Sequence, residues 1–321
     1  MTKIFISYSR VDKPFVEELI PLLQTVYGND SVWYDKDIRG GTQWWPEILS
    51  QIALCDIFLY LLSNESVSSE YCNKEYQEAK RLNKFIIPVE IRDRITIPDD
   101  IAKLQIVKLT NINNVKAIID LQAAIQYYDQ ISKQNKIEES KTQELKAQLI
   151  MQMGSAVYAV AIHAVEQLRQ HKWIDDGSLQ GKDFWKANLQ GAELDGANLK
   201  DSSFPAANLR QVRLADCNMQ NVWASATNFQ EAKLWRSNLQ QANLAESDFQ
   251  GAELVGANLQ GARLSLANLQ GTNLNLVKYD SNIVLPDDTN WSPNTDMTRF
   301  TNPKHPHFWR PKPGGVWWYP K

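Results

Sequence analysis

The sequence contains few cysteines, and none of them lies close to another along the chain. Cys55, Cys72 and Cys217 are the only three in 321 residues, and they are widely separated without a CxxC spacing. An odd and scattered set excludes a disulfide framework and does not have the ligand spacing of a zinc site. We therefore expect no metal and a reducing, intracellular compartment. The opening MTKIFISYSR has no charged lead followed by an apolar stretch and a cleavage site, so we predict no secretory signal and a cytoplasmic protein.

An excess of charge of one sign is also missing. The net charge is -3, from 34 basic and 37 acidic residues. Residues 1–110 contain 16 acids and 13 bases, and the two signs balance over residues 111–170 and again from residue 171 onward. No part of the chain is basic enough to predict binding to nucleic acid.

No uninterrupted hydrophobic run is long enough to cross a bilayer. The nearest one, Leu149 to Val165 (LIMQMGSAVYAVAIHAV), is shorter than the roughly 20 residues that a membrane helix needs, and polar residues interrupt it. Its apolar positions step by three or four from Leu145 to Leu168, which indicates one face of a helix. We therefore predict a single packed helix over residues 145–168 and no membrane span.

Short apolar runs alternate with amphipathic stretches over residues 1–110. The runs are KIFISYS, SVWY, DIFLYLLS and KFIIPVE. This alternation predicts an α/β domain with a parallel sheet and flanking helices, and continuous runs such as Ile57–Leu62 suit strands buried on both faces. We expect Asp12 to be the N-cap of the first helix, which Pro21 is placed to kink.

The segment 111–170 predicts a helical linker that also serves as an N-terminal cap for the C-terminal half of the chain. Val115, Ile118, Leu121 and Ile125 keep a helical period, and the polar run KQNKIEESKTQE then separates them from the predicted helix over residues 145–168. We therefore expect a connector with a solvated centre.

Beyond Asp176 the sequence has a period of five. Twenty-one successive centres, from Leu179 to Tyr279, are mostly Leu or Phe, and the residue two positions before each centre is mostly small and often Ala. Neither a helix nor a strand has this period. It suits a square coil in which the large residue fills the axis and the small one lets the wall close. The repeat Val222-Trp223-Ala224 departs from the pattern, and we predict a local bulge or wall loop that carries Trp223 outward.

These repeats resemble the pentapeptide-repeat family. Its pattern A-(D/N)-L-x-x appears as ANLQG at residues 187–191 and 257–261 and as ANLKD at residues 197–201. The resemblance implies a right-handed quadrilateral β-helix over residues 171–281, with four repeats per turn and a length of roughly 25 Å at the usual strand spacing. The balanced charge and the lack of a recognisable dimer tail disfavour the family role of acting on gyrase.

The ends of such a coil need caps, because they expose unpaired strand edges. The predicted helix of residues 145–168 precedes the coil, and an aromatic, proline-rich segment over residues 282–321 follows it. We interpret His305 and His307 as part of this C-terminal cap. The small residues near the start of the coil have two interpretations: they let helices of neighbouring chains approach closely, or they cap the coil within one chain. These residues are Gly154, Ser155, Ala156 and Ala159.

Three ordered motifs in the first 110 residues resemble the TIR family. IFISYSRVDK (4–13) is similar to its first strand and turn, and VWYDKDIRGGTQWWPEILSQI (32–52) to its second strand, BB loop and following helix. DIFLYLLSNESVSSEYCNKEYQEA (56–79) is similar to the third strand and the helix that carries the family's signature glutamate. The resemblance implies a flavodoxin-like TIR domain over residues 1–110.

In TIR domains that cleave NAD, the glutamate of a (W/Y)-C-x-x-E segment is catalytic. The matching segment here runs from Tyr71 to Glu75, so the resemblance implies Glu75 as the catalytic residue. The opposing interpretation makes Glu75 a solvated acid on a helix surface that pairs with Lys74 or Arg81. We interpret Cys72 as a buried packing thiol. The residues assigned to substrate binding are Tyr71, Ser7, Arg10, Asp35, Arg39 and Trp44.

The resemblance thus implies an NAD glycohydrolase that releases nicotinamide and ADP-ribose or its cyclised form, with NAD as substrate and no cofactor. Nicotinamide leaves a cationic ring as a neutral molecule, so a single carboxylate suffices where ordinary glycoside hydrolysis uses two. We expect assembly-regulated immune or stress signalling, in which the chain associates with itself through the TIR domain and through the linker or the β-helix. The β-helix is the expected sensing and assembly module, and an unidentified protein is a further expected partner. The alternative is a non-catalytic TIR scaffold that signals through protein-protein contacts.

Overall fold

The computed structural model describes residues 2–35 and 44–310. The chain divides into two compact units, Met1–Ser140 and Lys141–Lys321, called here the N-terminal and C-terminal units. The division falls inside the segment 111–170 that the sequence predicts to be a connector. Each unit has a hydrophobic core of its own.

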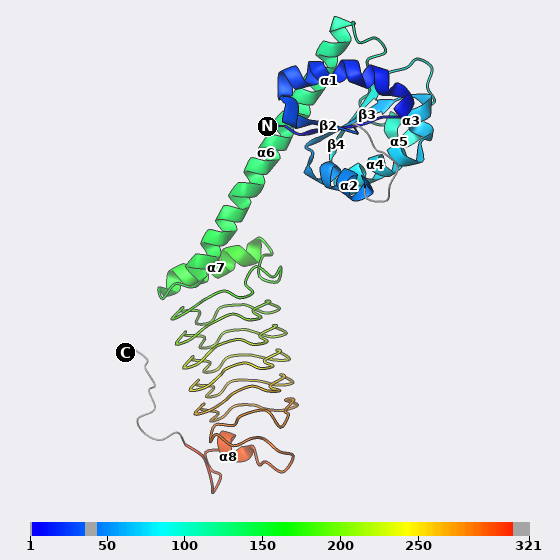
Figure 1. Ribbon diagram of the computed structural model, residues 1–321. Helices are drawn as coiled ribbons and strands as arrows, with labels where there is room; N and C mark the ends of the chain where they lie inside the picture. The colour runs from blue at the N-terminus through cyan, green and yellow to red at the C-terminus, as the bar shows by residue number, and fades with distance from the viewer. Residues whose placement is uncertain (1, 36–43, 311–321) are drawn as a thin grey trace. The chain divides into compact units, whose positions relative to one another are not determined.

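The N-terminal unit is built on a parallel five-stranded sheet with the order β2-β1-β3-β4-β5. Helices flank this sheet (Figure 1). Its strands are β1 (Ile4–Ser7), β2 (Val32–Tyr34), β3 (Ile57–Leu62), β4 (Phe85–Glu90) and β5 (Val107–Lys108). Its shorter helices are α1 (Lys13–Tyr27), α2 (Trp44–Leu54), α3 (Asn64–Ser68), α4 (Glu70–Arg81) and α5 (Asp99–Ala102). The predicted parallel sheet with flanking helices is confirmed. After β1 the chain adds β2 on one side and β3 on the other, so the strand order reverses at β1, where ligands of such folds bind.

Alternation along the strands divides the core of this unit between the two faces of the sheet. Ile4 and Ile6 point toward α1 and the start of α6 (Val115–Met153), whereas Phe5 points toward α2 and α4. Every residue of β3 is buried, as expected for a strand covered on both faces. The fully buried aromatic residues of this unit, such as Phe5 and Tyr60, lie on the side of the sheet that carries α2 and α4.

Asp12 takes the N-cap position of α1, as predicted, but its side chain does not cap the helix. Its carboxylate is fully buried; it accepts a hydrogen bond from Ser63 Oγ at 2.5 Å and pairs with the Arg92 guanidinium at 3.2 Å. Ser63 and Arg92 follow the carboxyl ends of β3 and β4. The Asp12 carboxylate therefore connects the start of α1 to the segments that follow β3 and β4.

The apolar segment 145–168 is not the single helix that its pattern predicts. Helix α6 ends at Met153 and helix α7 (Tyr158–Gln170) begins after a four-residue break. Residues 133–145 of α6 are exposed on all sides, which confirms a connector with a solvated centre. Among the helices in the described part of the chain, none is both long and apolar enough to cross a membrane.

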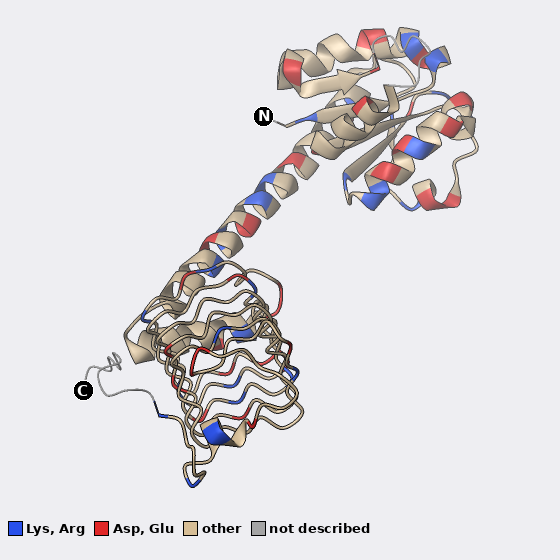
Figure 2. Cartoon of the chain, turned by 60° about the horizontal axis from the view of Figure 1, so that its bottom comes forward, with Lys and Arg blue, Asp and Glu red and all other residues tan. Residues whose placement is uncertain are grey.

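The C-terminal unit is a β-helix whose turn takes 20 residues. Parallel bridges join residues 20 apart along the coil, as between Asn188 and Asn208 and between Asn208 and Asn228. Four five-residue repeats therefore make one turn, as predicted. The centres fill the axis, and Phe184 stacks on Phe204 with ring centroids 4.9 Å apart. Acidic and basic residues are mixed along the wall of the coil (Figure 2), consistent with the balanced charge of the sequence.

The predicted bulge at residues 222–224 is wrong, although Trp223 does point outward. Trp223 bridges Ser203 on one side and Asn243 on the other, so the ladder is regular through this repeat. Ala224 occupies its axial position fully buried, while the Trp223 side chain is 54% exposed. The backbone pairing fixes the register here, and the small axial residue does not disturb it.

Both ends of the coil are covered. At the start, the Ser155 carbonyl accepts the Asn188 N–H at 2.8 Å, and a Cβ on Gly154 would lie 3.6 Å from the Asp183 carbonyl oxygen. At the far end, short helix α8 (Thr298–Thr301) places Phe300 under the last turn, and the Thr301 carbonyl accepts the Gly271 N–H at 2.8 Å. Gly154 and Ser155 therefore cap the coil within one chain.

Candidate functional site

Helix α4 places Glu75 beneath the carboxyl edge of the sheet. Ser69 begins the helix, where its side chain accepts the Cys72 N–H at 3.3 Å. The buried residues of α4 are Cys72, Glu75, Tyr76 and Ala79, at the spacing of one helix face. The glutamate thus replaces an apolar residue on the face that packs against the sheet.

The Glu75 carboxylate is bonded to the end of β1. Ser7 Oγ donates to Glu75 Oε2 at 2.6 Å, and the two residues are 1% and 9% exposed. Burial raises the pKa of Glu75 to about 7; the negative charge of Asp35 adds to this rise, and the Ser7 hydrogen bond opposes it. Near neutral pH both the carboxylate and the carboxylic acid form of Glu75 are therefore populated.

The interpretation of Glu75 as a solvated surface acid is wrong. Lys74 pairs with Glu70 at 2.7 Å, and Arg81 pairs with Glu78 at 2.7 Å. The basic neighbours of Glu75 on α4 are thus engaged by other acids, while its own carboxylate faces the core and Ser7.

A cleft of about 450 Å³, called here the Glu75 cleft, opens above this carboxylate. Aromatic side chains form part of its walls: Trp44 meets Tyr71 edge to face with ring centroids 5.0 Å apart, and Trp33 stacks on Phe5 at 4.8 Å. The volume lies in the range of small-molecule sites. One buried carboxylate between aromatic walls suits a flat ligand with positive charge.

Tyr8 holds the end of β2 against the end of β1. Its hydroxyl donates to the Asp35 backbone carbonyl at 2.6 Å. Burial, and after it the charge of Asp35, raises the pKa of Tyr8, so the phenol stays protonated and remains a donor. This contact fixes the backbone of Asp35, the residue after β2 at which the predicted BB loop begins.

The structure brings together the predicted site residues that it describes. Five line the Glu75 cleft: Glu75, Tyr71, Arg10, Asp35 and Trp44. Ser7 contacts the glutamate. Arg39 lies outside the described residues. Cys72 is buried as predicted, and burial raises the pKa of its thiol to about 11, which leaves it protonated and unsuited to be a nucleophile.

Sequence reasoning missed three aromatic residues of the cleft, namely Phe5, Tyr8 and Trp33. A signal for two of them was available. Phe5 and Trp33 are middle residues of two predicted strands, and parallel pairing puts them directly beside each other on one face. Tyr8 lies beyond the end of β1, where strand alternation no longer says which way a side chain points.

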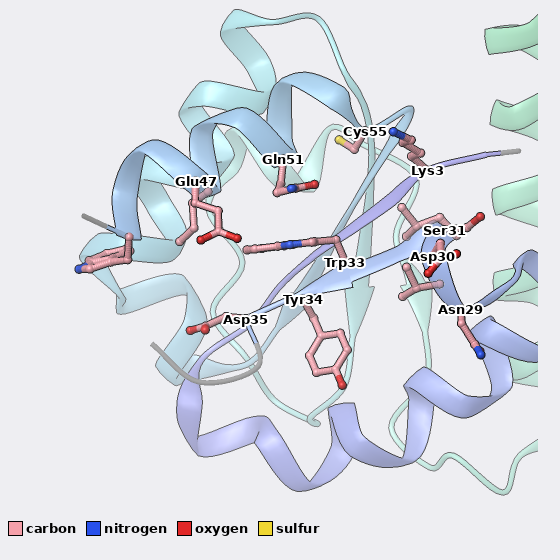
Figure 3. Close-up of a pocket in the computed structure, with 14 residues that line it drawn as sticks. Lys3, Asn29, Asp30, Ser31, Trp33, Tyr34, Asp35, Glu47, Gln51 and Cys55 are labelled. Atoms are coloured by element: carbon pink, nitrogen blue, oxygen red, sulfur yellow. The ribbon is translucent and has the colours of Figure 1, made fainter. Parts of the chain in front are cut away.

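A second hollow, called here the β2 groove, measures about 710 Å³ and follows the edge strand to residues 29–31 (Figure 3). It shares Trp33, Asp35, Trp44 and Ile48 with the Glu75 cleft. The two hollows therefore adjoin, with Trp33 as part of the wall of each.

Comparison with known families accounts for both units. Residues 4–121 match the family model described as TIR domain, and eight copies of the pentapeptide-repeat model match between residues 177 and 276. The chain therefore contains a TIR domain followed by a pentapeptide-repeat β-helix.

Solved structures of both kinds are similar to parts of the chain. HetL, a pentapeptide repeat protein from Nostoc sp. strain PCC 7120 involved in heterocyst differentiation regulation, is 26% identical, with a TM-score of 0.22; the match covers 35% of this chain and 61% of HetL. This chain thus spans less than two thirds of that protein. The TIR domain of a Toll-related receptor from Hydra magnipapillata is 17% identical over 39% of this chain and 99% of that one, with a TM-score of 0.33. A search of curated proteins found no match.

Proposed function

We propose that the TIR domain is an NAD glycohydrolase that cleaves NAD into nicotinamide and ADP-ribose or a cyclised form of it. The observation that carries this proposal is the buried Glu75 carboxylate, bonded to Ser7 at the base of an aromatic cleft. NAD is the substrate in this proposal, and no cofactor takes part.

A single carboxylate is sufficient for this reaction. The bond between ribose C1′ and the pyridinium nitrogen breaks, and its electron pair stays with nicotinamide, which leaves as a neutral molecule without a proton. The ribose becomes an oxocarbenium-like cation. A carboxylate about 4 Å away, at an effective dielectric near 20, contributes on the order of 4 kcal/mol, roughly a thousandfold in rate. Water then adds to C1′ and releases one proton.

The surroundings of Glu75 fit this role. Ser7 fixes Oε2, and we assign the other oxygen, Oε1, to the ribose hydroxyls. A cation bound nearby favours the ionised form of a carboxyl group, so the positively charged nicotinamide ring of the substrate lowers the pKa of Glu75 from about 7. Trp44 and Tyr71 offer the aromatic walls for the nicotinamide ring.

We further propose that assembly controls this activity in an immune or stress response in the cytoplasm. An NAD hydrolase that is always active depletes its own cell, and TIR domains associate with one another. The capped coil has no open end for stacking in the described residues, so we assign self-association to the TIR domain or to the wall of the β-helix. That wall is also the surface that we assign to an unidentified protein partner.

The direct test incubates the purified full chain with NAD over a wide range of protein concentrations, with and without a crowding agent, and follows free nicotinamide. Release of nicotinamide supports the proposal. No release at any concentration overturns it and leaves a TIR scaffold that signals through protein-protein contacts.

A further inference from the structure

We infer that the β2 groove holds the second nucleoside of the dinucleotide and that Glu47 makes this site selective for NAD over NADP. The inference rests on the proposed function, because it requires the nicotinamide half of the same molecule to lie in the Glu75 cleft.

Continuity of the two hollows supports the placement. The β2 groove and the Glu75 cleft share four lining residues, two on or just after β2 and two on α2, so a ligand that overfills the cleft extends along the edge strand. With volumes of about 450 and 710 Å³, each compartment lies in the size range of a small-molecule site and is large enough for one nucleoside half.

Trp33 gives the groove a rigid aromatic wall. Its indole stacks on Phe5 at 4.8 Å, and Phe5 stacks in turn on Phe58 at 5.3 Å, so three rings on neighbouring strands support one another. A purine base stacks well on such a fixed ring. Figure 3 shows the Trp33 indole reaching across the groove below the side chains of Glu47 and Gln51.

The charge of the lining decides which nucleoside fits. Among the described residues, the groove is lined by three carboxylates, Asp30, Asp35 and Glu47, and by one basic residue, Lys3. A carboxylate accepts hydrogen bonds from the two hydroxyls of an unmodified ribose, and it repels a ribose that carries a 2′-phosphate. Glu47 is the carboxylate on α2 that Figure 3 places next to Trp33, so we assign the ribose contact to it.

The first experiment measures kcat/KM of the full chain for NAD and for NADP. We expect the wild type to prefer NAD, and Glu47→Gln to reduce this preference about tenfold, because one neighbouring charge is removed from the 2′ position. Glu47→Lys is expected to lower it further. Glu18→Gln, which removes an exposed acid of α1 outside both hollows, is the matched control and should keep the wild-type ratio. An unchanged ratio in Glu47→Gln, with NAD still cleaved, overturns the inference and leaves the proposed function intact.

The second experiment removes catalysis from the test. Calorimetry with the full-length Glu75→Gln variant measures binding of ADP-ribose and of 2′-phospho-ADP-ribose. We expect ADP-ribose to bind more tightly, and the difference to shrink about tenfold when Glu47→Gln is added. Equal binding of the two probes, or binding of neither, overturns the inference whether or not wild-type protein cleaves NAD.

Discussion

Ser7 and Glu75, 68 residues apart in the chain, meet at 2.6 Å and tie the last residue of β1 to the second turn of α4. The hydroxyl donates to the carboxylate and therefore favours its ionised form, against the burial that raises its pKa. The proposed catalytic group is thus balanced between two opposing effects.

Removing this hydroxyl should shift the balance toward the protonated acid. In Ser7→Ala we expect the midpoint of the pH–rate profile to move to higher pH, by up to about one unit for the loss of a hydrogen bond to a charged group. The variant should therefore be slower near pH 7 and should recover at higher pH. A Ser7→Ala profile that falls by the same factor at every pH contradicts this account of Ser7.

The wild type should itself show a pH dependence centred near neutrality. The reaction needs the carboxylate, and the pKa of Glu75 is raised to about 7, so kcat/KM should rise as pH increases from 6 to 8. The midpoint of the kcat profile should lie at lower pH, because the cationic ring of bound NAD favours the ionised form of Glu75. Initial rates of nicotinamide release across this range measure both profiles, and a flat profile between pH 5 and 8 speaks against Glu75 as the ionising group.

The same raised pKa means that the ionised form of Glu75 lowers the free energy of unfolding at neutral and alkaline pH. The folded-state value of about 7 lies above the ordinary 4.5, so between these values the native state binds more protons than the unfolded one. Stability is therefore lost as pH rises from 4.5 to 7, by at most about 3 kcal/mol. Glu75→Gln should unfold at higher urea concentration than wild type above pH 7 and show little of this advantage near pH 4.5. A stability difference between the two proteins that does not vary with pH contradicts the burial argument.

The coil should reject charge on its axis. Leu239 is fully buried and Leu259 is 1% exposed, so Leu239→Asp or Leu259→Asp places an unpaired charge in a packed core and should cost several kcal/mol. Gln240→Asp, one position further along the wall, is the control and should melt close to wild type. Circular dichroism melts compare the variants; a soluble Leu239→Asp protein with an unchanged spectrum and a cooperative wild-type melt refutes the five-residue register.

Assembly control predicts that specific activity depends on protein concentration. Dilute protein should be nearly inactive, and activity should rise more steeply than linearly with concentration. Light scattering on the same samples supplies the mass. A constant specific activity from a strict monomer eliminates assembly control.

Much of the fold could be predicted from pattern in the sequence. The five-residue period sets the coil because each large residue, such as Leu239, needs the axis and each small one, such as Ala242, needs the wall. The same reasoning failed at Gly154, where the apolar spacing continues but the backbone packs against the coil and the helix breaks. A three-to-four spacing reports which side is buried and does not report whether the helix is continuous.

The candidate site was less accessible from the sequence. Position in a motif pointed to Glu75, but the hydrogen bond to Ser7 depends on how β1 packs beside α4, which no local pattern contains. Asp12 shows the same limit: its place before α1 predicts a cap, while tertiary contacts with Ser63 and Arg92 take its carboxylate instead. Long-range polar pairing is what sequence reasoning could not supply.

The most direct test of Glu75 as the catalytic carboxylate compares two isosteric variants on one helix. Glu75→Gln removes the buried carboxylate, and Glu70→Gln removes an exposed one from the first turn of α4. Nicotinamide release from NAD is measured at a protein concentration where the wild type is active, after circular dichroism has shown that both variants are folded. We expect Glu70→Gln to stay close to wild type and Glu75→Gln to lose about a thousandfold in rate. Near wild-type turnover by folded Glu75→Gln would contradict this assignment.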